Sequence, residues 1–317
     1  MLDIIYIIIG IIGLVWGGNW LVTGASRLAE SFGIPRLIVG LTIVAFGTSS
    51  PELLVNLSAV LNGSTDLALG NVLGSNISNI GVILGISGLL VPIMVRSSLI
   101  RREIPIMIGV AILAYLLSLD NQLGQLDGII LIICFVAFNA LMIWITLQDK
   151  SAQHAPDVDE FTTQEIKSVN RLREAGRLVA GLIILVIGAN LTVTGAINIA
   201  TALGVSQLII GVTLVALGTS LPELMASLIA AMRKESDLAI GNVVGSNIMN
   251  ILLILGSTAA ISPVNVPASV LQFDFLVMIA FSVVVLPLAW TSQKLARWEC
   301  GLFLVGYVAF VIVTLVR

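Results

Sequence analysis

Long apolar runs, interrupted at intervals by short polar stretches, extend along the whole chain of 317 residues. Most of these runs approach the roughly 20 apolar residues that a helix needs to cross a bilayer. The sequence therefore predicts an all-α integral membrane protein with ten transmembrane helices. Their expected ranges are 4–24, 37–61, 66–91, 104–118, 127–147, 176–198, 208–232, 237–262, 270–290 and 298–316.

The two halves of the chain repeat each other. Residues 10–92 align with residues 181–263 at a constant offset of 171 positions, without a gap. Because each half contains five helices, an odd number, the second half must enter the membrane upside down. Inverted repeats are typical of secondary transporters, whose ion site lies at the repeat interface near the middle of the membrane. We expect a first repeat over 1–147, a loop over 148–175 and a second repeat over 176–317, with repeated motifs at 40–85 and 211–256.

Composition and charge add an orientation. Hydrophobic residues make up 58% of the chain and charged residues 10%, which is not the composition of a soluble domain. Of the 15 lysines and arginines, 14 lie in or beside the connections that follow the odd-numbered helices. Since cytoplasmic connections carry the excess of Lys and Arg, both termini are expected outside and the 148–175 loop in the cytoplasm.

The 148–175 loop contains the sole histidine, His154, and the acidic residues Asp157, Asp159 and Glu160. A regulatory calcium site and a solvated linker are the two interpretations of this composition. The spacing lacks the glycine-anchored ligand loop of an EF-hand, and a charged stretch of this kind is usually a solvated face. We therefore favour the linker.

One short run carries the candidate chemistry and occurs in both halves. Residues 47–52 have the sequence GTSSPE, and residues 218–223 have the sequence GTSLPE. A carboxylate at the centre of a bilayer costs about 2.5–3.5 kcal/mol or more, so it is seldom present for packing alone. The proline before each glutamate lacks the N–H that would bond the carbonyl four residues back, which belongs to Gly47 or Gly218.

The side chains of this run are spaced to converge. Thr48, Ser49 and Glu52 fall on one face of a helix, and the second copy places its own set in the same way. Hydroxyl, carbonyl and carboxylate oxygens are the ligands that hard cations such as sodium and calcium prefer. The second set is Thr219, Ser220 and Glu223.

A second repeated run follows, with the sequence DLALGNVLGSNISN over residues 66–79 and DLAIGNVVGSNIMN over residues 237–250. Asn71, Ser75 and Asn79 are four residues apart and form one polar stripe, and Asn242, Ser246 and Asn250 do the same. Such residues can bind cations or can join helices by hydrogen bonds. We favour helix packing for Asn76 and Asn247, and ion ligation for Ser75, Asn79, Ser246 and Asn250.

Two further sets of residues have structural interpretations. Asp66 and Asp237 open predicted helices and are expected to be N-caps. Glycines recur in the first and sixth helices, where they allow close packing or leave a smooth surface on which helices can slide. These glycines are Gly10, Gly13, Gly17, Gly18, Gly24, Gly181, Gly188 and Gly195.

The patterns GTS-x-PE and GN-x-x-GSNI-x-N, each present twice, resemble the α-repeats of the cation/calcium antiporter superfamily, specifically its sodium/calcium exchanger branch and the prokaryotic members. The resemblance implies an antiporter in a prokaryotic plasma membrane that exchanges about three sodium ions for one calcium ion. It also implies alternating access, in which the first and sixth helices slide across the other eight.

The same resemblance implies roles for individual residues. Glu52 and Glu223 would hold calcium, and Thr48 and Thr219 would add backbone oxygens. The sodium sites would use the two glutamates with a further set of residues. That set is Ser49, Ser75, Ser220, Ser246 and the carbonyls of Ala45 and Ala216.

Departures from the family pattern limit the choice of driving ion. Some relatives, including the potassium-dependent exchangers, carry Asp where this chain has Asn250, so transport is expected to be independent of potassium. The main alternative is a calcium/proton antiporter of the same superfamily, but those proteins carry an acid where this chain has Gly74 and Gly245. An ion channel is the alternative from another class, and it would need weak binding at many sites along a pore.

The sequence indicates no enzyme, because P-loop and Gly-x-Ser-x-Gly signatures are both absent. The expected ligands are the transported calcium and sodium ions, without a cofactor. The lipid bilayer is the expected partner. Nothing points to nucleic acid or to an obligate protein partner, and the chain is compatible with a monomer.

Overall fold

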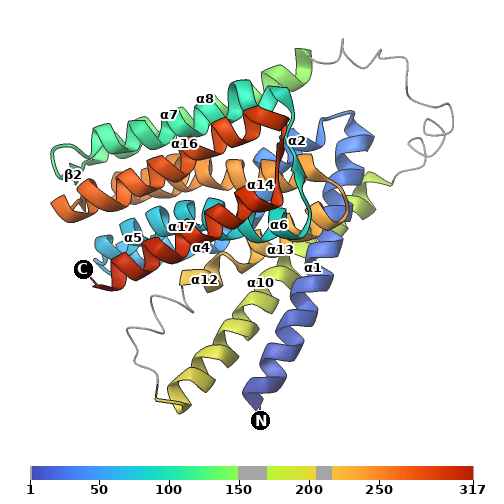
Figure 1. Cartoon of the computed structure of the whole chain (residues 1–317), viewed down its shortest axis with the longest axis horizontal. Helices are drawn as coiled ribbons and strands as arrows, with labels where there is room; N and C mark the ends of the chain where they lie inside the picture. The colour runs from blue at the N-terminus through green and yellow to red at the C-terminus, as the bar shows by residue number, and fades with distance from the viewer. Residues whose placement is uncertain (1, 149–169, 205–215, 317) are drawn as a thin grey trace.

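A computed structural model describes residues 2–148, 170–204 and 216–316, most of them helical, with π-helical segments labelled η (Figure 1). In chain order the helices are α1 (Leu2–Phe32), α2 (Arg36–Val39), η1 (Gly40–Val44), α3 (Ala45–Thr48), α4 (Ser50–Leu61), α5 (Thr65–Ser78), η2 (Asn79–Leu84), α6 (Gly85–Leu90), η3 (Leu99–Glu103), α7 (Ile104–Leu117), α8 (Gln125–Gln148), α10 (Arg171–Ala202), α12 (Ala216–Thr219), α13 (Leu221–Met232), α14 (Ser236–Met249), η6 (Asn250–Leu255), α15 (Gly256–Ile261), η7 (Val270–Asp274), α16 (Phe275–Ser292) and α17 (Arg297–Val316).

Two expectations fall partly outside the described residues. The first is the loop interpretation based on His154, Asp157, Asp159 and Glu160, all of which lie in the part of the chain that is not described. The second is the start of the predicted helix 208–232, since the described part of that helix begins at Ala216.

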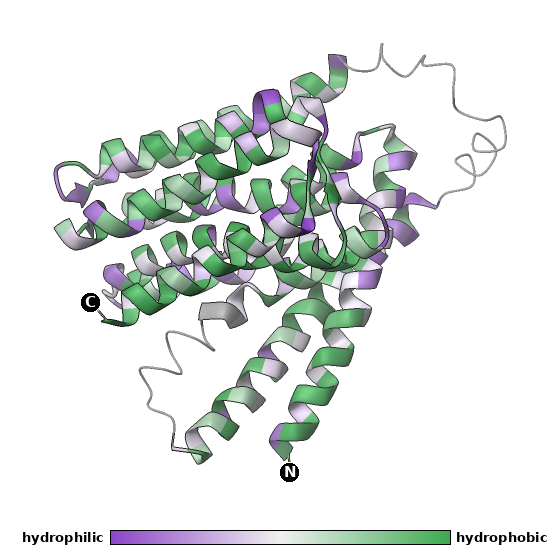
Figure 2. Cartoon of the chain, viewed as in Figure 1, coloured by the Kyte–Doolittle hydropathy of each residue, from purple (hydrophilic) through white to green (hydrophobic). Residues whose placement is uncertain are grey.

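Seven helices within the described ranges are long and apolar enough to cross a membrane, and an eighth is added if α2–α3 and the bent α4 form one span. The outer helices α8, α16 and α17 are mostly hydrophobic, and hydrophilic residues gather at helix ends and connections (Figure 2). The prediction of a helical membrane protein is confirmed. The count of ten spans stays a prediction. The continuous helix of η3 and α7 has Arg101, Arg102 and Glu103 near its start, and α13 has only 12 residues after the break at Ser220.

The two halves of the chain interlock. Strand β1 (Ile93–Met94) of the first half pairs with β4 (Lys294–Leu295) of the second, and β2 (Gln122–Leu123) pairs with β3 (Val264–Asn265). Helix α3 packs on α14, and its counterpart α12 packs on α5. In each repeat, the short helix that precedes the repeated glutamate therefore packs on the helix of the other repeat that contains the Asn-Ser-Asn stripe.

The π-helical segments follow the repeat. Segments η2 and η6 occupy residues 79–84 and 250–255, and η3 and η7 occupy residues 99–103 and 270–274, in both cases 171 positions apart. A π-helical turn holds an extra residue and is frequent at functional sites. Asn79 and Asn250 are the first residues of η2 and η6, so each predicted polar stripe ends where its helix widens.

Helices α1 and α10 lie side by side as a pair that projects at a slant from the other helices (Figure 1). Glycines allow this contact. A Cβ atom on Gly17 would lie 2.7 Å from the Gly181 carbonyl oxygen, and one on Gly188 would lie 2.8 Å from the Gly10 carbonyl oxygen. Gly13, Gly24 and Gly195 also face the partner helix of the pair, whereas Gly18 faces Ile229 of α13. The glycines thus chiefly join α1 to α10, and the surface that meets α13 is mainly aliphatic.

We expect Gly181→Ala to destabilise the folded protein by about 1–3 kcal/mol, because the added methyl group forces two tightly packed helices apart. That methyl group would come within 2.4 Å of the Leu21 backbone nitrogen. Gly176→Ala in the same helix is the matched control, since its methyl group would meet no atom within 4 Å. Thermal unfolding in detergent measures the difference. Equal unfolding midpoints for the two variants would contradict the role of the glycines in the α1–α10 contact.

Two details of the helix ends differ from prediction. Helix α1 continues to Phe32 instead of ending near residue 24, because Arg27 in its extra turns reaches Glu174 of α10 at 3.4 Å. Asp66 and Asp237 are not N-caps. They lie in the first turns of α5 and α14, where an acidic side chain favours the helix dipole, and Asp237 also pairs with the Arg96 guanidinium, 2.5 Å away.

Candidate cation site

Each repeated GTS-x-PE run forms a break between two helices. Ser49 separates α3 from α4 with φ −84° and ψ 3°, and Ser220 separates α12 from α13 with φ −88° and ψ 3°. The first break bends the chain by 44°. The proline after each serine occupies the first turn of the new helix, where its missing N–H costs nothing, and the glutamate follows in that turn.

Glu52 and Glu223 are buried, each with 1% of its surface exposed. They are close enough to interact electrostatically. Three of their four carboxylate oxygens lack a hydrogen-bond partner among the described residues. These are both oxygens of Glu52 and Oε2 of Glu223. Buried carboxylates without partners are costly, so this pair of side chains is suited to a cation that binds between them.

A serine hydroxyl of the first repeat joins Glu223 of the second repeat to it. The Ser49 hydroxyl donates to Glu223 Oε1 at 2.9 Å and lies 3.0 Å from the Ser246 hydroxyl. In the mirrored position, Ser220 lies beside Glu52 without a well-directed hydrogen bond to it. The structure therefore brings these five predicted residues together across the repeat interface.

Asn242 holds this arrangement in place. Its amide Nδ2 donates to the Ser227 hydroxyl at 2.9 Å and to the Glu223 carbonyl at 3.4 Å. Its Oδ1 accepts from the Thr48 hydroxyl at 3.1 Å. The same hydroxyl lies 3.1 Å from the Val44 carbonyl of η1, so its single proton is shared between these two acceptors. One buried amide thus couples Thr48 of the first repeat to the backbone at Glu223 of the second.

The first repeat contains the matching pair, because Asn71 Nδ2 donates to Asn56 Oδ1 at 2.7 Å. Asn56 and Ser227 each lie four residues after a site glutamate, on the same helix face. Asn71 and Asn242 were expected on the two polar stripes, where residues bind cations or join helices, whereas Asn56 and Ser227 had no predicted role. The signal was present, since each pair recurs at the 171-residue offset, but a contact between separate helices is not visible in a linear pattern.

The remaining stripe residues are buried. The Oδ1 atoms of Asn79 and Asn250 have no hydrogen-bond partner within the described residues. Asn79 Nδ2 donates to Asn247 Oδ1 at 2.9 Å, so Asn247 joins helices as predicted. Asn76 does not, because its amide bonds back to the Val72 carbonyl of its own helix.

The other predicted ligands hold less distinctive positions. Ser75 is buried in α5, 5% exposed, and Thr219 ends α12. The Ala45 carbonyl already accepts the Ser49 N–H at 2.9 Å, which leaves it one lone pair. Ala216 is the first described residue of α12.

The donor set is made of oxygen atoms, with two carboxylates and several neutral groups. Over the described ranges, no three His, Cys, Asp or Glu side chains gather closely enough to hold a metal ion. Two carboxylates with amide, hydroxyl and carbonyl oxygens suit hard cations such as sodium and calcium rather than transition metals. With a charge of −2, the pair matches one divalent ion.

A helical membrane protein with such a buried carboxylate pair belongs by its chemistry among the cation transporters. More particularly, the chain belongs to the sodium/calcium exchanger protein family, whose model matches residues 2–144 and 174–316. Several of the matched proteins are named as exchangers or antiporters, which are transporters.

Individual relatives match along nearly the whole chain. A protein of Alkalimonas amylolytica with the provisional name antiporter CaxA is 41% identical, over 92% of this chain and 91% of its own. The sodium/calcium exchanger MaX1 of Methanosarcina acetivorans is 32% identical, over 98% of each chain. A solved structure of the sodium-calcium exchanger NCX_Mj superposes with a TM-score of 0.85 at 32% identity, over 100% of this chain and 99% of the other.

Proposed function

We propose that this protein is a secondary antiporter that exchanges sodium for calcium across a prokaryotic plasma membrane. The observation that carries the proposal is the pair Glu52 and Glu223, buried at the crossing of two helix breaks with three carboxylate oxygens unpartnered in the described chain. Two relatives that match along nearly the whole chain, MaX1 and NCX_Mj, are named as sodium/calcium exchangers and support sodium and calcium as the ions.

The site residues have distinct proposed roles. Glu52 and Glu223 hold calcium with carbonyl oxygens of Thr48 and Thr219, and their charge attracts sodium in the other half of the cycle. Asn79 and Asn250 offer further amide oxygens, which are unpartnered within the described residues. Sodium occupies positions around the same carboxylates, with oxygens from a set of neutral residues: Ser49, Ser75, Ser220, Ser246, Ala45 and Ala216.

We further propose ten transmembrane helices in two inverted five-helix repeats, with both termini outside and the 148–175 loop in the cytoplasm. Several basic connections lie together at one end of the molecule. Arg36 approaches Glu235, Arg96 pairs with Asp237, and β1 pairs with β4. This end is the cytoplasmic face by the positive-inside rule. The α1–α10 pair, joined by its glycines, moves as one body against the rest.

A calcium/proton antiporter is the second candidate, because the relative CaxA is named as an antiporter without its ions. The resemblance to the superfamily implies that its proton-coupled members carry an acidic residue at the positions of Gly74 and Gly245. A Cβ atom on Gly245 would lie 2.5 Å from the Leu41 carbonyl oxygen, whereas one on Gly74 would meet no atom of the described chain within 4 Å. The lack of an acid at both positions therefore favours the sodium-coupled cycle, and lack of space accounts for it only at Gly245.

The test is calcium-45 uptake into proteoliposomes with sodium, potassium or proton gradients imposed one at a time. We expect an outward sodium gradient to drive uptake at an unchanged rate when choline replaces all potassium, because the amide of Asn250 adds no charge to hold a potassium ion. Uptake that stops without potassium would contradict the assignment of Asn250. Uptake driven by a proton gradient alone would favour the second candidate.

A further inference from the structure

A pocket lined by arginine, tryptophan and small polar side chains lies outside the carboxylate site, where the α1–α10 pair meets the end of α13. Its volume is about 580 Å³, within the range of roughly 300–1,000 Å³ that small-molecule sites occupy. Three arginines from three helices line it: Arg27 of α1, Arg177 of α10 and Arg233 at the C-terminal cap of α13. None of these residues has a role in the proposed ion site.

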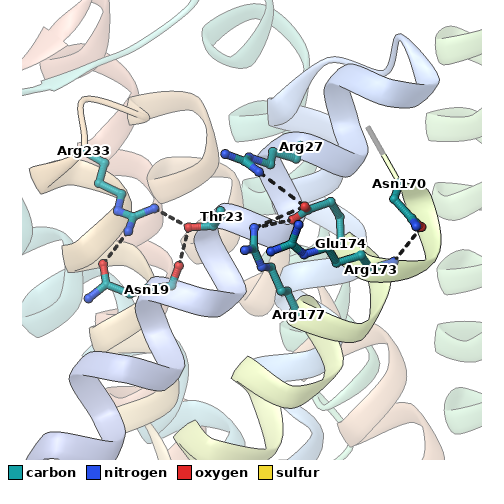
Figure 3. Close-up of polar contacts among 8 residues, drawn as sticks. All are labelled: Asn19, Thr23, Arg27, Asn170, Arg173, Glu174, Arg177 and Arg233. Atoms are coloured by element: carbon teal, nitrogen blue, oxygen red, sulfur yellow. Dashed lines mark hydrogen bonds and ion pairs between the residues drawn. The ribbon is translucent and has the colours of Figure 1, made fainter. Parts of the chain in front are cut away.

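The pocket carries excess positive charge. Arg27 and Arg177 share one buried carboxylate, Glu174, at 3.4 Å and 3.2 Å. Arg233 instead donates to neutral oxygens, Thr23 Oγ1 at 2.5 Å and Asn19 Oδ1 at 2.7 Å, and forms no ion pair within the described part of the chain. Three guanidiniums against one carboxylate leave a charge of +2. Figure 3 shows Arg233 reaching α1 beside the cluster in which Arg27 and Arg177 meet Glu174.

The guanidiniums are accessible to a ligand. The Arg27 side chain is 52% exposed and the Arg177 side chain 27% exposed, while Glu174 beneath them is 3% exposed. Guanidinium groups bind phosphate oxygens through paired N–H donors. The exposed charge and the volume of the pocket therefore suit a phosphate-bearing anion.

The surroundings of the pocket identify the source of that phosphate. Trp16 and Trp20 of α1 line the pocket and are 66% and 48% exposed. The exposed face of α1 that leads to them is apolar, with Ile8 and Ile12 half exposed. Tryptophan at the end of an apolar helix face marks the level of lipid headgroups. A free anion would gain nothing from these rings, whereas a phospholipid places its acyl chains along that face.

We propose that the pocket binds the phosphate headgroup of an anionic phospholipid in the cytoplasmic leaflet. The choice of the cytoplasmic leaflet rests on the membrane orientation given under the proposed function. The binding of the lipid does not depend on that orientation. Arg27, Arg177 and Arg233 contact the headgroup, and Trp16 and Trp20 pack against the glycerol region. Because Arg233 belongs to the helix that carries Glu223, the lipid joins α13 to the α1–α10 pair.

The test measures lipid binding by the full-length purified protein in neutral detergent, by native mass spectrometry, with no ion gradient. Phosphatidylglycerol is titrated against phosphatidylcholine, with inorganic phosphate in a separate arm. Each basic group near an anionic membrane surface contributes about 1 kcal/mol, so we expect Arg233→Gln to weaken phosphatidylglycerol binding about fivefold. Arg233→Lys keeps the charge and should stay within twofold of the parent protein.

Two further variants keep the test decisive. Thr23→Glu places a carboxylate beside Arg233, so it should weaken binding to a similar extent even if Arg233→Gln fails to fold. Arg297→Gln is the matched control, since this exposed arginine also bonds a neutral oxygen, the Leu90 carbonyl at 3.3 Å, and lies outside the pocket. It should stay within twofold of the parent.

Three results would overturn the proposal. They are equal affinity for the two lipids, full competition by inorganic phosphate at millimolar concentration, and equal weakening by Arg233→Gln and Arg297→Gln. Calcium-45 uptake is measured separately. Lipid binding without sodium-driven uptake would therefore count against the proposed function alone, and uptake without selective lipid binding would count against this inference alone.

Discussion

Glu52→Gln and Glu223→Gln are each expected to reduce sodium-driven calcium uptake to the level of protein-free liposomes. Calcium binds about six to eight oxygens, and the two glutamates supply up to four of them together with both negative charges. Glutamine keeps the shape and one oxygen but removes the charge. The ion would then remain under-neutralised in a region of low dielectric constant, where electrostatic interactions are much stronger than in water.

The control for this experiment is Glu103→Gln. Glu103 is also buried, with 0% of its surface exposed, but it ends η3 at the start of α7, and its carboxylate pairs with Arg102. We expect this variant to retain uptake when reconstituted at equal protein density. Near-normal uptake by either Glu52→Gln or Glu223→Gln would contradict the site assignment, and loss of uptake in all three variants would indicate a general effect of removing a buried charge.

The sequence predicted the parts of the site that depend on local spacing. The 171-residue offset placed Glu52 and Glu223 in equivalent positions. Spacing also placed Thr48, Ser49 and Glu52 on one face of a single helix, whereas the structure breaks that helix at Ser49 and leaves Thr48 in α3 and Glu52 in α4. The same spacing argument brought Ser49 and Ser246 into the list of candidates. The structure then placed these two hydroxyls 3.0 Å apart.

Contacts between helices and changes of helix type were not predictable from spacing. The bond from Thr48 to Asn242 joins residues 194 positions apart, and it depends on how α3 lies across α14. The π-helical turns that begin at Asn79 and Asn250 arise in apolar sequence without a proline to mark them. The extension of α1 to Phe32 depends on the ion pair from Arg27 to Glu174 of another helix.

The charge of the site leads to an electrical prediction. Two ionised glutamates give the empty site a charge of −2, which is costly to move through hydrocarbon, so the empty carrier should rarely reorient. One calcium ion brings the charge to zero, and three sodium ions bring it to +1. The neutral oxygens around the glutamates allow more than two sodium ions, and three is the number that we propose. A cycle of three sodium ions for one calcium ion then moves one net charge.

Membrane potential should therefore change both the rate and the final level of calcium uptake. One charge across 100 mV is worth about 2.3 kcal/mol, which corresponds to roughly a fortyfold change in the calcium ratio at equilibrium. In sodium-loaded proteoliposomes clamped with potassium and valinomycin, three sodium ions leave for each calcium ion that enters, so uptake should be fastest with the inside positive. Vesicles containing Glu52→Gln give the background leak at each potential. A final level that stays constant between inside-positive, zero and inside-negative potentials would exclude three-for-one exchange and would indicate an electroneutral cycle of two sodium ions per calcium ion.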